Sequence, residues 1–191
     1  MEMLGNRRLG VTQQQAWEAL NDPETLRKCI PGCDKFELTG ENQYTVALAL
    51  KIGPVSAKFN GKVTLADIQA PDSYKLSFEG QGGVAGFAKG ASSVSLKPVA
   101  DGGDGCELDY TVQAQVGGKI AQMGQRLIDG AAKSTADDFF KRFDAEMQSR
   151  YGPPAGADEA PEPEKTGAVA GFMQKLGLGK KASPGGEEPA D

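Results

Sequence analysis

The side chains that most often carry out chemistry at neutral pH are scarce in this sequence. It contains no histidine and three cysteines, which excludes serine–histidine and cysteine–histidine catalysis and histidine zinc sites. Two of the cysteines form Cys29-Ile-Pro-Gly-Cys33, a spacing one residue longer than that of redox-active pairs, and no second pair could complete a zinc tetrahedron. An odd number of cysteines argues against a disulfide framework. We therefore expect structural cysteines, no metal and no catalytic residue.

Two further patterns resemble chemical sites without matching them. The glycine-rich stretch Gly80–Gly90 lacks the Gly-Lys-Ser/Thr ending of a phosphate-binding loop and leads into a predicted strand rather than a helix. The adjacent carboxylates of Asp137-Asp138 diverge around a helix and cannot act as a pair. A cyclase or hydrolase remains as an enzyme alternative. It would need an acid or base that faces a cavity, for example Tyr44, Asp67 or Glu79.

Length and composition indicate a folded domain followed by a tail. The chain has 191 residues, of which 39% are hydrophobic and 25% charged. A net charge of −5 excludes a nucleic-acid partner, because phosphate binding needs a basic surface. No apolar run is long enough to span a bilayer, and the first eight residues lack the apolar segment of a signal peptide. We expect a cytoplasmic protein.

The region from residue 34 to residue 117 has the pattern of an antiparallel sheet. Apolar residues recur at every second position, as in Tyr44, Val46, Leu48 and Leu50. Glycine, proline, asparagine and aspartate separate six such runs with short turns, and connections this short force neighbouring strands to be antiparallel. An opening strand within residues 2–9 brings the sheet to about seven strands.

Two small helices are predicted between the first strand and the rest of the sheet. Thr12 is followed by Gln15 at the spacing of a capping box, which predicts the start of a helix that carries Trp17. Pro23 suits the first turn of a second helix, which ends before the turn Pro31-Gly32.

Gly118–Tyr151 is predicted to be one long C-terminal helix with an apolar stripe. The stripe consists of residues three or four positions apart, namely Ile120, Met123, Leu127, Ala131, Thr135, Phe139, Phe143 and Met147. Gly124 and Gly130 interrupt it at a cost of about 1 kcal/mol each relative to alanine. They reflect either close backbone packing or simple tolerance of glycine, or they leave room for something that lies beneath the helix.

These elements predict an α+β fold in which a curved antiparallel sheet wraps around the long helix. A curved sheet and a straight helix do not meet everywhere, so we expect an apolar cavity between them. The side chains expected to line it and to bind a ligand are Phe59, Val63, Phe78, Phe87, Leu96, Tyr110, Met123, Leu127 and Ile128. The alternative is that they form an ordinary packed core.

The chain after the folded domain, which we assign to residues 1–151, divides into three segments. Residues 152–166 are rich in proline, alanine and glutamate and are predicted to be a disordered linker. Residues 167–181 have the spacing of a short amphipathic helix, and residues 182–191 are predicted to be a disordered tail. The amphipathic segment is expected to bind either a membrane or a protein groove. Its candidate membrane-binding residues are Val169, Phe172, Met173, Lys175, Leu176, Leu178, Lys180 and Lys181.

Several short motifs, in the order in which they occur, give residues 1 to about 150 a family resemblance. They are Ala16-Trp17, Asn21–Glu24, Cys29–Cys33, Lys51–Val55, Phe59–Gly61, Gly117–Gly124 and Phe139-Phe140. On these motifs the chain resembles the family of the G subunit of the molybdenum carbon monoxide dehydrogenase system, within the START-like superfamily of polyketide cyclases and lipid-transfer proteins. The resemblance implies a helix-grip fold, an apolar cavity and no catalytic residues. It also implies a role in attaching the dehydrogenase to the membrane.

Together, these observations predict a non-enzymatic accessory protein of a molybdenum hydroxylase of the carbon monoxide dehydrogenase type. A respiratory quinone is the expected cargo, since its isoprenoid tail needs a dry tunnel and the dehydrogenase needs an electron acceptor that resides in lipid. The protein would then lie at the inner face of the cell membrane as a peripheral protein. A general carrier of apolar ligands and a pure membrane scaffold are the alternatives.

Overall fold

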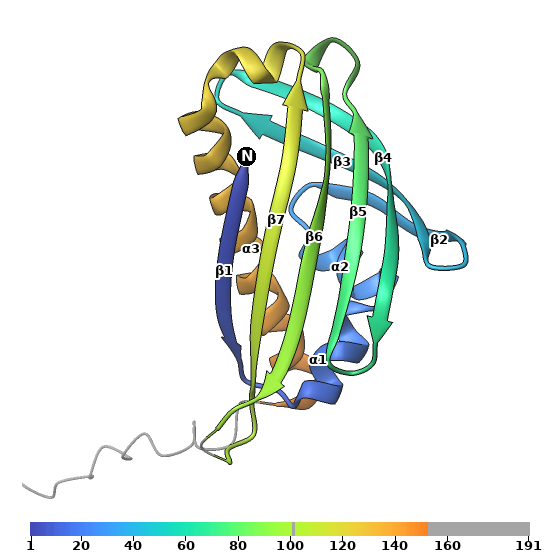
Figure 1. Cartoon of the computed structure of the whole chain (residues 1–191), viewed down its shortest axis with the longest axis vertical. Coiled ribbons are helices and arrows are strands. Elements are labelled where there is room, and N and C mark those ends of the chain that lie inside the picture. Colours follow the sequence, from blue (N-terminus) through green and yellow to red (C-terminus); the bar gives the residue numbers. More distant parts are fainter. Residues whose placement is uncertain (101, 153–191) are drawn as a thin grey trace, which may run out of the picture. The chain divides into compact units, whose positions relative to one another are not determined.

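The computed structural model describes residues 1–100 and 102–152 of the chain (Figure 1). The strands are β1 (Glu2–Leu9), β2 (Cys33–Gly40), β3 (Gln43–Ile52), β4 (Val55–Gln69), β5 (Ser73–Gln81), β6 (Phe87–Pro98) and β7 (Cys106–Gly117). The helices are α1 (Gln13–Leu20), α2 (Pro23–Cys29) and α3 (Gln125–Tyr151), and two 3₁₀ turns are η1 (Gly83–Ala85) and η2 (Lys119–Met123).

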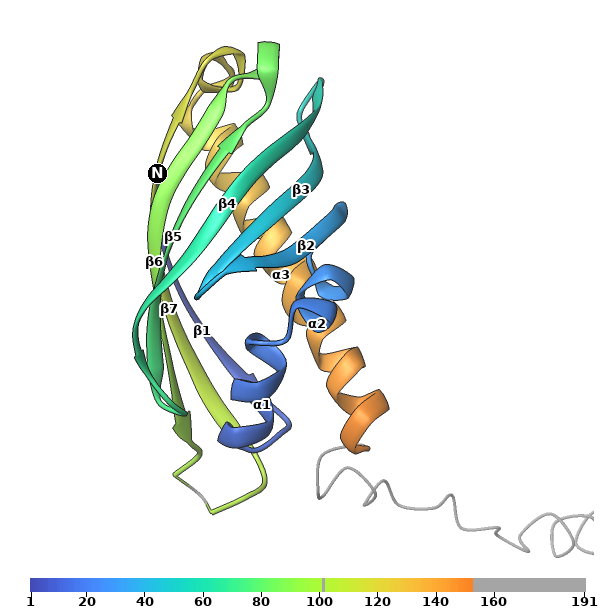
Figure 2. The same cartoon turned by 90° about the vertical axis from the view of Figure 1, so that its right-hand side faces the viewer.

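The strands form one antiparallel sheet in the order β1-β7-β6-β5-β4-β3-β2. Strands β2 to β7 follow each other as hairpins, while β1 pairs with β7, so β1 and β2 are the two edges. The sheet curves, and α3 lies along its concave face (Figures 1 and 2). The predicted α+β fold, with its seven strands, two small helices and long C-terminal helix, is confirmed.

The two small helices begin where their capping residues predict. The Thr12 hydroxyl accepts a hydrogen bond from the Gln15 backbone N–H, and the Gln15 side chain accepts one from the Thr12 N–H, which completes the capping box. The Asp22 carboxylate caps α2, with Pro23 at its first position.

A closed core fills one end of the space between the sheet and the helices. Trp17 and Leu20 of α1 pack there against strand residues and the C-terminal half of α3. Phe143 is completely buried in this cluster. We call this cluster the closed end; its buried members are Leu9, Val11, Ala16, Trp17, Ala19, Leu20, Cys29, Tyr74, Leu96, Cys106, Leu108, Phe140, Phe143 and Met147.

The predicted continuous helix from Gly118 is wrong at its N-terminal end. Lys119–Met123 forms the separate turn η2, and α3 begins only at Gln125. Gly124 separates the two with a φ of +89°, a backbone conformation that side chains rarely adopt. A Cβ atom at Gly124 or Gly130 would meet nothing within 4 Å, so close packing does not explain either glycine.

Within the described parts of the chain, none of the helices has the length and apolar character needed to cross a bilayer.

Candidate ligand cavity

An apolar cavity of about 550 Å³ lies between the concave face of the sheet and α3. Pockets of this size commonly hold small organic ligands. Strands β3 to β7 supply the residues that alternate inward, and α3 supplies one face. The apolar part of the lining includes Leu48, Leu50, Ile52, Phe59, Val63, Leu65, Leu76, Phe78, Val94, Val112, Val116, Ile120, Ile128, Ala131, Ala132, Ala136 and Phe139.

The cavity stays open because small residues face it at the middle of α3. Ala131, Ala132 and Ala136 line it from the helix, where the closed end has Phe140 and Phe143 instead. On the sheet, a Cβ atom at Gly90 would lie 2.8 Å from Cζ of Phe78, so Gly90 leaves room for that ring. Bulky side chains therefore fill the space between the helix and the sheet at the closed end, whereas the small residues at the middle of α3 leave it empty.

Five of the nine residues predicted to bind a ligand line this cavity: Phe59, Val63, Phe78, Tyr110 and Ile128. Their contact with a ligand stays a prediction.

Phe87 and Leu96 lie outside the lining, each because of its position on β6. Ala88, opposite Val116 on β7, faces the cavity, so the preceding Phe87 lies on the other face of the sheet, opposite Gly117. Leu96 has the inward parity but sits in the closed end, where it is 2% exposed.

Met123 and Leu127 also lie outside the lining because α3 starts later than predicted. Met123 belongs to η2, and Leu127 is 40% exposed. Both side chains lie over Gly53 at the turn between β3 and β4, where a Cβ atom would come within 3.1 Å of Cε of Met123 and 2.9 Å of Cδ2 of Leu127.

Sequence reasoning did not assign Tyr74, Ala132 or Tyr44 to ligand binding, although all three line the cavity. Strand pairing could have identified both tyrosines, because Tyr74 alternates in phase with Phe78 on β5 and Tyr44 lies directly opposite Val63 of β4. Burial raises the pKa of Tyr44 and of Tyr74, and the proximity of Tyr44 adds to the effect on Tyr74.

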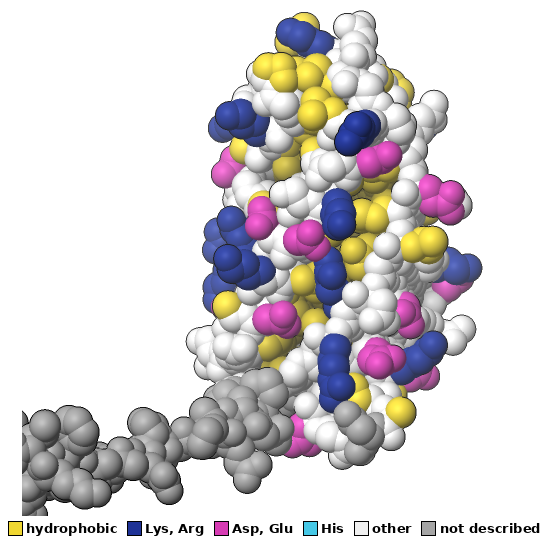
Figure 3. Space-filling model, turned by 90° about the vertical axis from the view of Figure 1, so that its left-hand side faces the viewer, with side chains coloured by type: hydrophobic (Ala, Val, Ile, Leu, Met, Phe, Trp, Pro, Cys, Tyr) yellow, Lys and Arg dark blue, Asp and Glu magenta, His cyan; other side chains and the backbone are white. Residues whose placement is uncertain are grey.

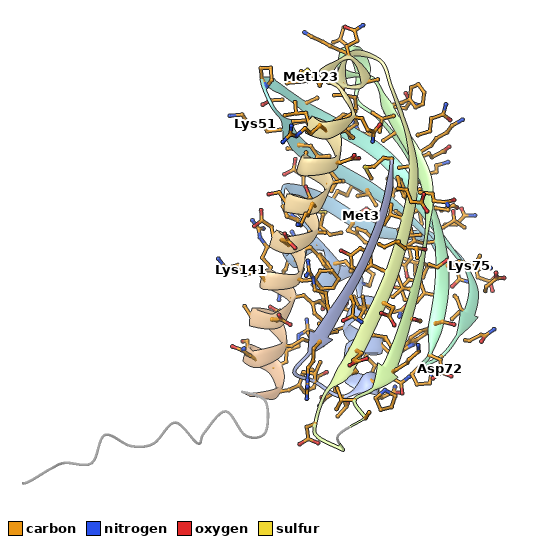
Figure 4. The ribbon with its side chains drawn as sticks, turned by 60° about the vertical axis from the view of Figure 1, so that its left-hand side comes forward. Met3, Lys51, Asp72, Lys75, Met123 and Lys141 are labelled. Atoms are coloured by element: carbon orange, nitrogen blue, oxygen red, sulfur yellow. The ribbon has the colours of Figure 1, made fainter. Side chains whose placement is uncertain are left out.

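The other acid or base candidates do not face the cavity with a carboxylate. Asp67 is exposed and pairs with Lys75 at 2.8 Å, and Lys75 points away from α3 (Figure 4). Glu79 is exposed between the inward-facing Phe78 and Gly80. Among the described residues, the titratable groups that come together in the cavity are tyrosines, and no carboxylate joins them to form an acid and base pair.

One side of the cavity is bounded by edge strand β1 and α3. Met3 of β1 and the preceding Met1 contribute to the lining, and Met3 lies on the side of β1 that faces α3 (Figure 4). Hydrophobic side chains form a strip on this side of the molecule, between charged groups of both signs (Figure 3). Nearer the closed end, Arg7 forms an ion pair with Asp137 of α3, and its guanidinium lies 5.3 Å from the ring centre of Phe140. These contacts join β1 to α3.

The three cysteines are free thiols, of which Cys29 and Cys106 are buried. Burial raises the pKa of Cys29 and of Cys106 to about 11 and also raises the pKa of the half-buried Cys33. Within residues 1–100 and 102–152, no cluster of three or more cysteine or acidic side chains could hold a metal ion. The candidate membrane-binding residues 169–181 and the predicted segment boundaries at 166 and 181 lie outside the described residues.

The comparisons with known proteins agree with this geometry. A family model described as the carbon monoxide dehydrogenase G subunit (CoxG) matches residues 5–148. The chain belongs to the CoxG family. A conserved protein from Geobacillus kaustophilus has a similar structure, with a TM-score of 0.73 and 38% identity over 78% of this chain and 96% of its own. No match was found among curated proteins.

More distant structures share the fold of this CoxG-family chain. A START superfamily protein from Mycobacterium smegmatis has a TM-score of 0.60 at 12% identity, covering 78% of this chain and 98% of its own. A protein from Thermus thermophilus has the same TM-score at 11% identity and covers 79% of this chain and 99% of its own. These matches show that the chain has a START-like fold.

Proposed function

We propose that this CoxG-family protein is a non-enzymatic accessory protein of a molybdenum-containing oxidoreductase of the carbon monoxide dehydrogenase type. In this proposal its cavity holds an apolar ligand, a respiratory quinone, and the protein brings the dehydrogenase to the cytoplasmic membrane. The observation that carries the ligand-binding part is the apolar cavity of about 550 Å³ under α3. The family's name supports the dehydrogenase as partner.

A quinone suits this cavity because the lining is apolar over most of its length, with few polar side chains among its members. Transfer of an isoprenoid chain from water to such a surface is favourable by about 25 cal/mol for each Å² buried. An enzyme that passes electrons to the respiratory chain needs an acceptor that dissolves in lipid. A protein that holds this acceptor outside the bilayer would connect the dehydrogenase with the membrane.

The carrier function can be tested by filling the cavity. Ala132→Trp places an indole among the small residues of α3, and Ala91→Trp places the same group at an exposed position on β6. Titration with decylubiquinone should show binding to the native protein and to the Ala91 variant, and at least tenfold weaker binding to the Ala132 variant. Equal binding by both variants, or none by the native protein, would overturn the carrier function.

Membrane recruitment depends on residues 167–181, and its test uses the full-length chain. Replacing Phe172 and Met173 together by aspartate removes apolar contacts with a bilayer and adds like charge toward anionic lipid. Flotation with phosphatidylglycerol-containing liposomes should recover the native chain and much less of the double variant. Equal flotation would leave the cavity function intact and exclude this segment as the membrane anchor.

A further inference from the structure

Two buried tyrosines line the cavity, and their hydroxyls have no hydrogen-bond partner in the part of the chain that the structure describes. Tyr44 of β3 is 8% exposed and Tyr74 of β5 is 6% exposed. Both residues line the cavity. Within the described residues, neither hydroxyl makes a hydrogen bond, and neither oxygen is among the fully enclosed polar atoms, so both remain accessible to a bound molecule.

The two rings are held in place by aromatic neighbours, of which Phe36 also lines the cavity. Trp17 of α1 packs edge-on against Tyr74 with ring centres 5.5 Å apart, and Phe36 of β2 packs against Tyr44 at 5.2 Å. Leu65 packs against the cluster of Tyr44 and also against that of Tyr74, so it links the two positions. The hydroxyls are therefore preorganised in one region of the cavity.

The other polar side chains of the lining do not offer the same chemistry. The Thr135 hydroxyl already donates to the Ala131 carbonyl at 2.8 Å. Lys51 and Lys62 are exposed, and Lys51 lies near the opposite end of β3 from Tyr44. Ser92 is only half buried. Tyr44 and Tyr74 are thus the buried lining residues whose hydroxyls are available to a ligand in the cavity.

We propose that Tyr44 and Tyr74 form the head-group site of the cavity and donate hydrogen bonds to a neutral acceptor, a carbonyl oxygen, on an otherwise apolar ligand. This inference deepens the proposed carrier function and rests on it. Because burial raises both tyrosine pKa values, the hydroxyls keep their protons at neutral pH and act as donors. Within residues 1–100 and 102–152, an ionised head group has no buried cation beside these tyrosines to pair with, which favours a quinone or ketone over a carboxylate.

The site also fixes the direction of the ligand. With its carbonyl at Tyr44 and Tyr74, the apolar remainder would extend toward the region of Phe59 and Ile120, where those buried side chains pack with Leu50 and Ile52. The head group would then lie beside the closed end and the tail beneath the start of α3.

The test compares two probes that share a decyl chain, decylubiquinone with carbonyl oxygens and n-decylbenzene without any. Tyr44→Phe and Tyr74→Phe keep the rings and remove only the hydroxyls. Each should weaken decylubiquinone binding roughly three- to tenfold, the range of a neutral hydrogen bond, and leave decylbenzene binding unchanged. The infrared carbonyl band of bound decylubiquinone should shift toward higher frequency in each variant.

Tyr151→Phe is the control for the loss of a tyrosine hydroxyl, because Tyr151 at the end of α3 is 42% exposed and lies outside the cavity lining. It should change neither affinity. Unchanged decylubiquinone affinity in the Tyr44 and Tyr74 variants, or an equal loss for both probes or in Tyr151→Phe, would overturn the head-group site while the carrier function stands. If neither probe binds the native protein, the carrier function fails and the head-group site with it.

Discussion

The closed end and the cavity are built on the same sheet and the same helix, yet one is solid and the other hollow. At the closed end, α1 inserts Trp17 between the sheet and α3, and α3 contributes the buried rings of Phe140 and Phe143. Beside the cavity, the middle of α3 contributes Ala131, Ala132 and Ala136, and α1 and α2 add Leu20 and Leu26 to the lining. The two regions therefore differ mainly in the size of the side chains that α3 presents to the sheet.

This contrast separates stability from binding. Fully buried, well-packed side chains supply most of the free energy of folding. Residues such as Val63 and Phe78 are only half buried because they border empty space, so they contribute less. The closed end can therefore hold the domain together while the cavity remains free to accept and release a ligand.

The largest expected effect comes from opening the closed end. Phe143→Ala removes a ring that is completely buried among large neighbours, and such changes cost about 3–5 kcal/mol because they leave a void. Urea unfolding should show this loss in the free energy of unfolding. A loss below about 1 kcal/mol would mean that this end is not the solid core that the contrast requires.

The same change beside the cavity should cost less stability and more binding. Phe78→Ala removes a half-buried ring that borders existing space, so we expect a loss of about 1.5 kcal/mol in unfolding free energy. Decylubiquinone affinity should fall about tenfold, since the ring no longer contacts the ligand. If Phe78→Ala destabilised the protein as much as Phe143→Ala, the two regions would not differ in the way proposed.

The sequence predicts the fold well because the fold depends on local patterns. Alternation of period two identifies each strand, and Thr12 with Gln15 marks the start of α1. The separation of the two regions is harder to predict. Periodicity shows that Leu96 and Val63 face the same side, but whether an inward residue meets a partner or a void depends on which residues of α1 and α3 lie opposite.

The errors in the predicted lining have specific causes. Gly124 occurs within a helical pattern, so its positive φ and the late start of α3 are not visible in the sequence, and the prediction for Met123 and Leu127 fails for that reason. Phe87 is out of phase with Val94 on the same strand, so strict alternation along β6 would have excluded it. The sequence cannot identify Tyr44 and Tyr74 as head-group candidates. Only the structure shows that their hydroxyls lack hydrogen-bond partners among the described residues.

A polar network ties the closed end to the C-terminal turn of α3 and makes its stability depend on pH. Arg150 donates to the hydroxyl of the fully buried Thr25 at 2.6 Å and pairs with Glu146 and Asp22. Burial tends to raise the pKa of Asp22 and Glu146, but hydrogen bonds outweigh it and hold both pKa values below their usual range.

Arg150→Gln should lower the free energy of unfolding by about 1 kcal/mol at pH 7, a value reduced by partial exposure of the network. Because the two carboxyl pKa values are depressed in the folded state, their contribution is present above about pH 4.5 and is lost as the pH falls through the folded values. The difference between native protein and variant should therefore shrink toward about pH 2.5 in urea unfolding. A constant difference would show that Arg150 acts through packing alone, and ligand affinity should not change.

The smallest expected effect lies at the boundary between the two regions, where Arg7 of β1 pairs with Asp137 and covers Phe140. Arg7→Gln should cost only about 0.5 kcal/mol, because the ion pair is partly exposed to water. Arg7 also lowers the pKa of Asp144, which burial raises, so the variant should raise that pKa further in an NMR titration. In about 1 M salt the stability difference should diminish, because salt screens the ion pair. A loss as large as that of Phe143→Ala would place Arg7 within the closed end rather than at its edge.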